Sequence, residues 1–328
     1  MGKLNRKNIS VSLILIISLC FLIHTFKDVE FSKLIVILKG VKPFYIILWV
    51  VIFLIGTIGR AYRWKLLLPK GEHTLSNLFH SLNIGNLATM ILPFRAGEFV
   101  RPFYLSRWSE VSFAKSMISV ILERVFDVIG MFVMFYFFVS DVKNIPEVIQ
   151  LSANGLGYLC IFLVLGIVFA RFFPSTIRRI AIFFFKLLPT KFYDPLLKIF
   201  DEVLGGLGAI RHFSQLSMII SLTLLLWLSY AYSFSLILES LSSDSVTMAQ
   251  GAITTVFVAL AIAAPNAPGF LLTFEMGASA ALSVFAYPQE FSLAFALIAH
   301  FCQLFSTILL GLFSLWSKGL TLKSLKTS

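Results

Sequence analysis

The feature that most limits the fold of this chain is a series of long apolar runs separated by short basic segments. A helix that spans a bilayer needs about 20 mostly apolar residues. The composition agrees with such spans, because 58% of the 328 residues are hydrophobic and only 13% are charged. A soluble domain carries about 25% charged residues. The candidate full spans lie at roughly 8–25, 43–59, 112–140, 154–171, 214–238 and 290–317.

Two further apolar regions, at about 76–107 and 246–287, are each interrupted near the middle by proline and glycine. Irregular backbone is tolerated at membrane depth only where protein or a polar cavity covers its polar groups. We therefore predict two re-entrant helical hairpins that enter from opposite faces, either as an inverted repeat of the transporter kind or through a chance likeness of the two breaks. The helix-breaking residues are Pro93, Gly97, Pro265, Pro268 and Gly269.

The basic residues predict the orientation of the chain. The net charge is +11, but these residues mostly lie between apolar runs, which favours topology signals and contacts with anionic lipid over nucleic-acid binding. Both termini and the segment at about 173–212 are basic, so we expect them on the cytoplasmic side of a cell (inner or plasma) membrane. That segment is typical of amphipathic helices on the membrane surface, a plain basic loop being the alternative. Segment 26–42 carries four lysines on the predicted outer side and departs from this pattern. We expect one integral membrane domain over 1–328.

The first break contains an unusual group of charges, ILPFRAGEFVRP. If a helix starts there, Glu98 and Arg101 share one face, and Gly97 permits a close backbone approach or a positive φ. The free N–H groups of a helix start favour an anion, and Arg95 with Arg101 would form a phosphate clamp. The alternative is an ordinary cytoplasmic turn.

A second charged group, ILERVFD, lies within the predicted span at 112–140. Ionisable groups at such depth cost about 2.5–3.5 kcal/mol each on insertion scales. We therefore expect Glu123, Arg124 and Asp127 to face the protein interior and to meet partners, for which Arg95 and Arg101 are candidates. The alternative is that the group lies near the interface and reaches water.

Three other polar residues lie within the interrupted regions. Glu275 has no basic neighbour in sequence, so it either pairs with a distant arginine or stays protonated. Asn83 and Asn86 line a polar path or form hydrogen bonds between helices.

No known catalytic or metal-binding pattern appears. The HExxH, GxSxG and phosphate-loop motifs are missing, the five histidines are scattered, and the three cysteines lie in separate apolar runs. We expect no cofactor and no metal.

Three ordered elements resemble the lysylphosphatidylglycerol synthase transmembrane family, also called flippase-like or UPF0104. Its pattern P-x-R-x-G-E-x-x-R matches Pro93 to Arg101, and E-R-x-x-D matches Glu123 to Asp127. Its third element, P-G-x-x-G-x-x-E, is similar to Pro268–Glu275. There, Leu272 stands where the family usually has a second glycine, which puts a close backbone approach in doubt.

The resemblance implies an integral membrane protein whose relatives move or present lipids. In the multiple peptide resistance factor this region is fused to a soluble domain that makes lysyl-lipid. The present chain stops a few residues after its last predicted span, so we expect no such transferase activity and no enzyme.

The leading hypothesis is a flippase-like lipid translocase for an anionic or polyprenyl-linked lipid. In this hypothesis three arginines bind the headgroup phosphate: Arg95, Arg101 and Arg124. Three acids hold these arginines in place: Glu98, Glu123 and Asp127. Glu275 accepts a proton or a cationic headgroup.

Two alternatives belong to other classes. The chain is either a non-transporting scaffold or lipid-presenting subunit that partners an envelope lipid or glycan enzyme, or an intramembrane glycosyltransferase with Glu98 or Asp127 as base.

Overall fold

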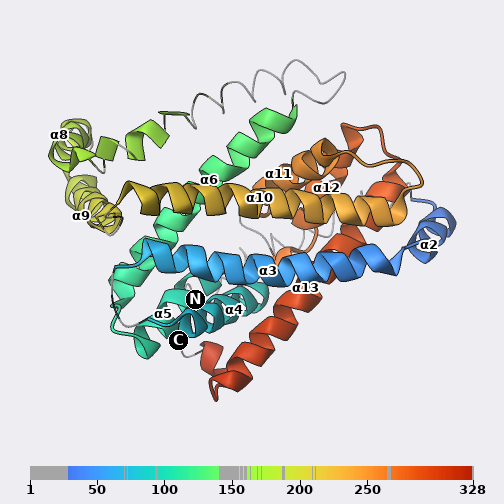
Figure 1. The fold of residues 1–328 in the computed structure, drawn as a ribbon, viewed down its shortest axis with the longest axis horizontal. Coiled ribbons are helices and arrows are strands. Elements are labelled where there is room, and N and C mark those ends of the chain that lie inside the picture. The colour runs from blue at the N-terminus through green and yellow to red at the C-terminus, as the bar shows by residue number, and fades with distance from the viewer. Residues whose placement is uncertain are drawn as a thin grey trace, which may run out of the picture. The chain divides into compact units, whose positions relative to one another are not determined.

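Every element in the described part of the chain is a helix, as the computed structural model in Figure 1 shows. The structure describes residues 29–326, with gaps at 70, 72, 93–94, 140–154, 156–157, 159–160, 163, 168, 171, 187–188, 209, 211 and 264–266. The helices are α2 (Phe31–Lys39), α3 (Pro43–Leu67), α4 (Leu75–Ile91), α5 (Gly97–Trp108), α6 (Phe113–Val139), α8 (Pro174–Phe185), α9 (Thr190–Leu207), α10 (Phe213–Leu241), α11 (Met248–Ala263), α12 (Thr273–Ser283) and α13 (Gln289–Ser317), with short 3-10 turns η2 (Pro268–Phe270) and η3 (Leu322–Lys326).

Three of the described helices, α3, α10 and α13, are long and apolar enough to cross a membrane, at 25, 29 and 29 residues. They contain the predicted spans at 43–59, 214–238 and 290–317. The bounds of α6 also match the predicted span, and its otherwise apolar sequence carries the charged residues Lys115, Glu123, Arg124 and Asp127. The expected all-helical, polytopic membrane fold is confirmed.

The ends of α13 illustrate how local sequence sets a span. The helix begins directly after Pro288, and Glu290 in its first turn is favourable beside the free N–H groups of the helix start. It ends at Ser317, and Gly319 follows with a φ of 64°, a backbone conformation that glycine adopts without strain.

Several predicted features lie outside the described residues. They are the first span at 8–25, the connection at 141–153, most of the span at 154–171, and the helix-breaking residues Pro93 and Pro265.

The predicted end of the second span was wrong. The predicted span ended with the apolar run, at Gly59. Instead α3 continues to Leu67 and includes both Arg60 and Arg63. The helix continues because Arg63 has buried acidic partners, which are described below.

The described residues form two compact units. Of the described residues, the first unit draws on 29–55, 83–98 and 229–326, and its core consists mainly of side chains from α10, α11, α12 and α13. The second draws on Gly56–Leu82 and Phe99–Leu228, with two apolar clusters around α3 and α6.

The first interrupted region forms two helices around a break. At one end, the Asn77 side-chain amide donates to the Trp108 carbonyl over 2.8 Å. At the other end, a Cβ on Gly97 would overlap the Gly85 carbonyl oxygen and would lie 2.5 Å from the Thr89 nitrogen. Gly97 therefore permits close contact between the backbones of α5 and α4. Among the described residues of this break, the positive φ, 55°, belongs to Arg95.

The second interrupted region also forms two helices, α11 and α12, which lie side by side (Figure 1). A Cβ on Gly277 would lie 2.8 Å from Val258 Cα, so this glycine permits the contact. In the turn between them Gly269 has a φ of 71°, whereas Phe270 and Leu272 have positive φ values of 61° and 70° without being glycine. Leu272 thus adopts the backbone conformation for which a glycine is suited.

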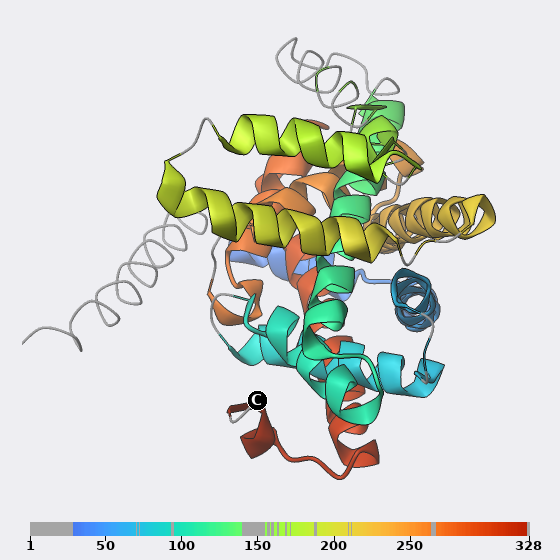
Figure 2. The ribbon, with the colours of Figure 1, turned by 90° about the vertical axis from the view of Figure 1, so that its left-hand side faces the viewer.

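The segment predicted as amphipathic contains α8 and α9, which lie side by side in Figure 2. Arg178 donates two hydrogen bonds to Asp201, at 2.7 and 2.9 Å, across this pair. These bonds hold the pKa of the Asp201 carboxyl below its usual value. The helical character of the segment is therefore observed, and its position at the cytoplasmic surface stays a prediction.

We expect Gly97→Ala to lower the free energy of unfolding by about 1–3 kcal/mol, because the added methyl group overlaps backbone atoms that cannot rotate away. Thermal denaturation in detergent measures this effect. The matched control is Gly166→Ala, since nothing lies within 4 Å of that Cβ position. Equal stabilities of the two variants would contradict the close contact.

Candidate functional site

The charges of α6 lie in the second unit, together with basic residues from α3 and α5. We call these side chains the arginine–carboxylate cluster. Its members are Arg60, Arg63, Arg101, Glu123, Arg124 and Asp127. The sequence brings them together because α3 presents Arg60 and Arg63 one turn apart, and α6 presents its two acids one turn apart.

Glu123 is the centre of this cluster and is completely buried. The guanidinium of Arg101 donates to both of its carboxylate oxygens, with Nη1 3.2 Å from Oε1 and Nη2 on Oε2. Arg63 and Arg124 approach Oε1 at 3.5 and 3.4 Å. A buried carboxylate is tolerated when it is paired and hydrogen-bonded in this way.

Asp127 is the second acid, one turn further along α6. Arg63 Nη2 lies 2.7 Å from its Oδ1, and Arg124 Nη1 lies 3.3 Å from its Oδ2. Arg63 also donates to the Thr223 hydroxyl of α10 over 3.0 Å. Gly130 makes this approach of α10 feasible, because a Cβ there would lie 2.7 Å from the Thr223 methyl carbon.

An aromatic side chain fixes Arg101 from the other direction. The guanidinium carbon lies 3.9 Å from the centre of the Trp64 ring, a cation–π contact. The Trp64 indole donates to the Ser119 hydroxyl over 2.8 Å. Arg101 is therefore held between a carboxylate and an indole that is itself anchored.

The described cluster carries four guanidiniums and two carboxylates, so its formal charge is 4 − 2 = +2. The side chains of Arg63 and Arg101 are 1% and 3% exposed, whereas those of Arg60 and Arg124 are 22% and 39% exposed. Positive charge is thus accessible on the side where Arg60 and Arg124 lie, which suits an anion.

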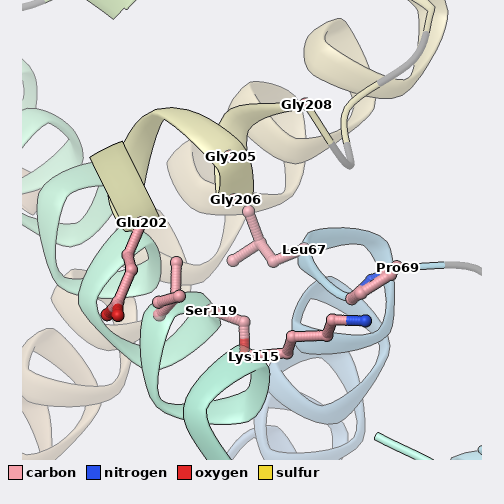
Figure 3. Close-up of a pocket in the computed structure, with 9 residues that line it drawn as sticks. Leu67, Pro69, Lys115, Ser119, Glu202, Gly205, Gly206 and Gly208 are labelled. Atoms are coloured by element: carbon pink, nitrogen blue, oxygen red, sulfur yellow. The ribbon is translucent and has the colours of Figure 1, made fainter. Parts of the chain in front are cut away.

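A cavity of about 400 Å³ also lies in the second unit, between the end of α3, the start of α6 and the end of α9 (Figure 3). Its wall is mostly apolar, and Lys115 and Glu202 are its charged lining residues. Ser119, the acceptor for Trp64, is part of the same wall. The cavity is therefore joined to the cluster through Ser119, Trp64 and Arg101. Gly205 has no atom within 4 Å of its Cβ position, which helps to keep the space open.

The remaining predicted residues of the first hairpin belong to the first unit. Arg95 and Glu98 form an ion pair of 3.4 Å, with side chains 31% and 23% exposed. In α4, Asn83 is buried and Asn86 is partly buried.

Glu275 has a partner in the same unit that is not an arginine. His300 Nδ1 lies 2.6 Å from Glu275 Oε1, and His300 Nε2 lies 2.7 Å from the Gly269 carbonyl oxygen. The Phe274 ring stacks on the imidazole with a centre-to-centre distance of 4.6 Å.

The structure brings together some of the predicted site residues. Arg101 meets Glu123, and Arg124 contacts both Glu123 and Asp127. Arg95 pairs with Glu98 within its own break. The predicted roles of these residues in binding lipid stay predictions.

Sequence reasoning missed five residues of these sites: Arg60, Arg63, Trp64, Thr223 and His300. Arg60 and Arg63 have helical spacing, which could have extended the second span, but hydropathy alone ended it at Gly59. His300 lies alone in an apolar helix, and the scattered histidines indicated interfacial or packed side chains rather than a site.

We expect Arg63→Met to lower the free energy of unfolding by about 3–5 kcal/mol, because fully buried Glu123 loses one of its cations and partly buried Asp127 loses its closest one. The control is Lys65→Met, an exposed position on the same helix. Adding Asp127→Asn to Arg63→Met should recover part of the loss, since it removes the uncompensated charge. Chemical denaturation in detergent measures all three, and an Arg63→Met variant as stable as Lys65→Met would refute the pairing.

The comparisons with known proteins agree with this architecture. The family model for the lysylphosphatidylglycerol synthase TM region matches residues 9–311. A UPF0104 membrane protein of Methanocaldococcus jannaschii is 26% identical over 147 residues, which are 42% of this chain and 44% of that relative. The matched stretch therefore spans less than half of that relative, and no solved structure matches the chain. Because the family match covers nearly the whole chain, this multi-pass membrane protein belongs to the lysylphosphatidylglycerol synthase transmembrane-region family.

Proposed function

We propose that the protein is a lipid translocase that handles an anionic or polyprenyl-linked membrane lipid. The observation that carries this proposal is the net positive arginine–carboxylate cluster, held inside an apolar helical unit with part of its charge accessible. Intramembrane ionisable groups are expensive, and those that persist usually mark a pathway or a binding site. Membership of a family named for a lipid-modifying synthase supports a role in lipid handling.

The headgroup contact is assigned to Arg124 and Arg60. Their side chains are the two most exposed guanidiniums of the cluster. Guanidinium groups bind phosphate with two parallel hydrogen bonds, which makes arginine suitable for a lipid phosphate. A phosphate at this side would offset the excess charge of the cluster.

The buried members have a positioning role. Arg101 and Arg63 are almost fully buried, and their nearest acids are Glu123 and Asp127. The acids thus fix the arginine side chains and reduce the charge of the empty site, as the sequence suggested. Arg95 and Glu98 form a separate ion pair in the first hairpin and are not part of the cluster.

The cavity beside the cluster is suited to the apolar part of the lipid. Its volume of about 400 Å³ lies within the range of small-molecule sites, about 300–1,000 Å³. The lining is mainly apolar, and the Lys115 side chain extends toward Pro69 in Figure 3.

The second candidate is a lipid-presenting or scaffold subunit of an envelope enzyme. The complete burial of Glu123 supports it, because a purely structural ion-pair network would have the same geometry. In that case the cluster substitutions would lower the amount of folded protein, and the protein would not transfer lipid.

We expect Arg124→Gln to lower lipid transfer in proteoliposomes about 10- to 100-fold, the loss of one charge-assisted contact of about 1.5–3 kcal/mol. The assay uses fluorescent phosphatidylglycerol and a polyprenyl-phosphate analogue. The control is Arg178→Gln, an exposed arginine of α8 outside the cluster. Transfer by folded wild type that Arg124→Gln leaves unchanged would overturn the site, and no transfer at all would favour the subunit.

We expect Gly205→Leu to reduce transfer severalfold without loss of stability, because its side chain occupies the cavity and meets no atom within 4 Å at Cβ. Gly166→Leu, at another open position, is the control. Unchanged transfer by Gly205→Leu would show that the lipid does not use the cavity.

A further inference from the structure

Glu275 and His300 hold a proton between them that the proposed function does not use. His300 Nε2 faces the Gly269 carbonyl oxygen at 2.7 Å, and a carbonyl only accepts, so Nε2 carries a hydrogen. His300 Nδ1 faces Glu275 Oε1 at 2.6 Å. A second hydrogen must lie in this contact, because two lone pairs would otherwise repel each other.

This second hydrogen has two equivalent descriptions. Either an imidazolium donates to a carboxylate, or a carboxylic acid donates to a neutral imidazole. The net charge of the pair is zero in both cases. Loss of the hydrogen would leave a charge of −1 at a place where His300 is buried and Glu275 Oε2 has no hydrogen-bond partner among the described residues.

Several elements around the pair carry other ionisable groups. α10 packs on Phe274 through Phe234 and carries Tyr230, Tyr232 and Glu239. α2 packs on α13 and carries Lys33 and Lys39. α11 has none, and Glu275 is the only one on α12. α13 adds Glu290, ten residues before His300 and so about 15 Å along the helix, and the Cys302 thiol in the apolar core. From the first break, Met90 approaches Gly269, and the pair Arg95–Glu98 follows in the chain.

The pair is attached to a strained turn. Leu272 has φ 70° and ψ −38°, near the rare γ-turn conformation, and Phe270 also has a positive φ. Such conformations persist only where the surrounding contacts impose them. The bonds from His300 to the Gly269 carbonyl and to Glu275 hold this turn at both ends.

We propose that Glu275 and His300 form a proton-binding site that closes the turn Pro268–Leu272, and that loss of the shared proton opens this turn. The ligand is a proton, and its binding energy is linked to the closed form of the second hairpin. Repulsion between Nδ1 and the carboxylate separates the two side chains, and the strain at Phe270 and Leu272 favours relaxation of the turn.

The inference deepens the proposed function and rests on it for its meaning, since a proton site on the second hairpin gives lipid movement a coupling ion. It can be tested without lipid transfer. If the pH-dependent opening is present and transfer is absent, this inference stands and the proposed function fails. If transfer depends on Arg124 and the turn is insensitive to pH, the reverse holds.

The experiment is amide hydrogen exchange on the purified full-length protein in nanodiscs from about pH 5 to pH 9, corrected for the intrinsic exchange chemistry. In wild type, we expect the opening equilibrium of residues 268–276 to rise about tenfold per pH unit once the proton dissociates. Protection of α11 should stay constant over the same range, which also reports that the protein remains folded.

Two variants and a control make the result specific. In Glu275→Gln, the side-chain amide replaces the carboxyl group and can donate to Nδ1 without a shared proton, so protection of 268–276 should lose the wild-type dependence on pH. In His300→Gln, the turn should be open even at low pH, because both bonds of the imidazole are lost. Glu290→Gln, an acid in the first turn of α13, should keep the wild-type profile.

The inference is overturned if protection in wild type does not vary with pH, or if Glu275→Gln retains the wild-type dependence. It is also overturned if Glu290→Gln abolishes that dependence, since the titrating acid would then be Glu290.

Discussion

The architecture of the second unit follows from the burial of one carboxylate, Glu123 on α6. A buried carboxylate without partners is strongly destabilising, and the effective penalty is several kcal/mol even after relaxation. Three other helices contribute to the pairing of Glu123 or of the neighbouring acid, Asp127. α3 remains helical past its apolar run to supply Arg63, α5 supplies Arg101, and α10 approaches through the space left by Gly130. The lengths and contacts of these helices are therefore consequences of one charge.

This arrangement is difficult to explain by stability alone. Replacing a buried ion pair with apolar residues of similar volume is often neutral or stabilising. A sequence selected only for folding in lipid would carry leucine or phenylalanine at these positions. The cluster instead has more guanidiniums than carboxylates, and its exposure increases from Arg63 to Arg124. A graded, net positive site is what an anionic ligand requires, which is why function explains the excess charge better than packing does.

The sequence predicted the spans well where hydropathy decides them and poorly where a tertiary partner decides them. The predicted spans at 112–140 and 290–317 agree with α6 and α13 to within a residue or so at each end. The end of α3 was missed because its last two turns contain three basic residues, and the acids that make Arg63 tolerable there, Glu123 and Asp127, lie some 60 residues later. His300 was missed for the same reason, since its partner lies on another helix.

The two interrupted regions are similar at the end of the hairpin opposite the break and differ in the backbone of the break. In each, an amide side chain at the third position of the first helix, Asn77 or Gln250, bonds to a group at the end of the hairpin. The sequence pattern pairs Gly97 with Gly269, yet Gly97 allows close contact whereas Gly269 supplies a positive φ. If the regions are repeats, their breaks have diverged, the first around an ion pair and the second around a histidine. That divergence is expected when one hairpin contributes charge and the other contributes a proton.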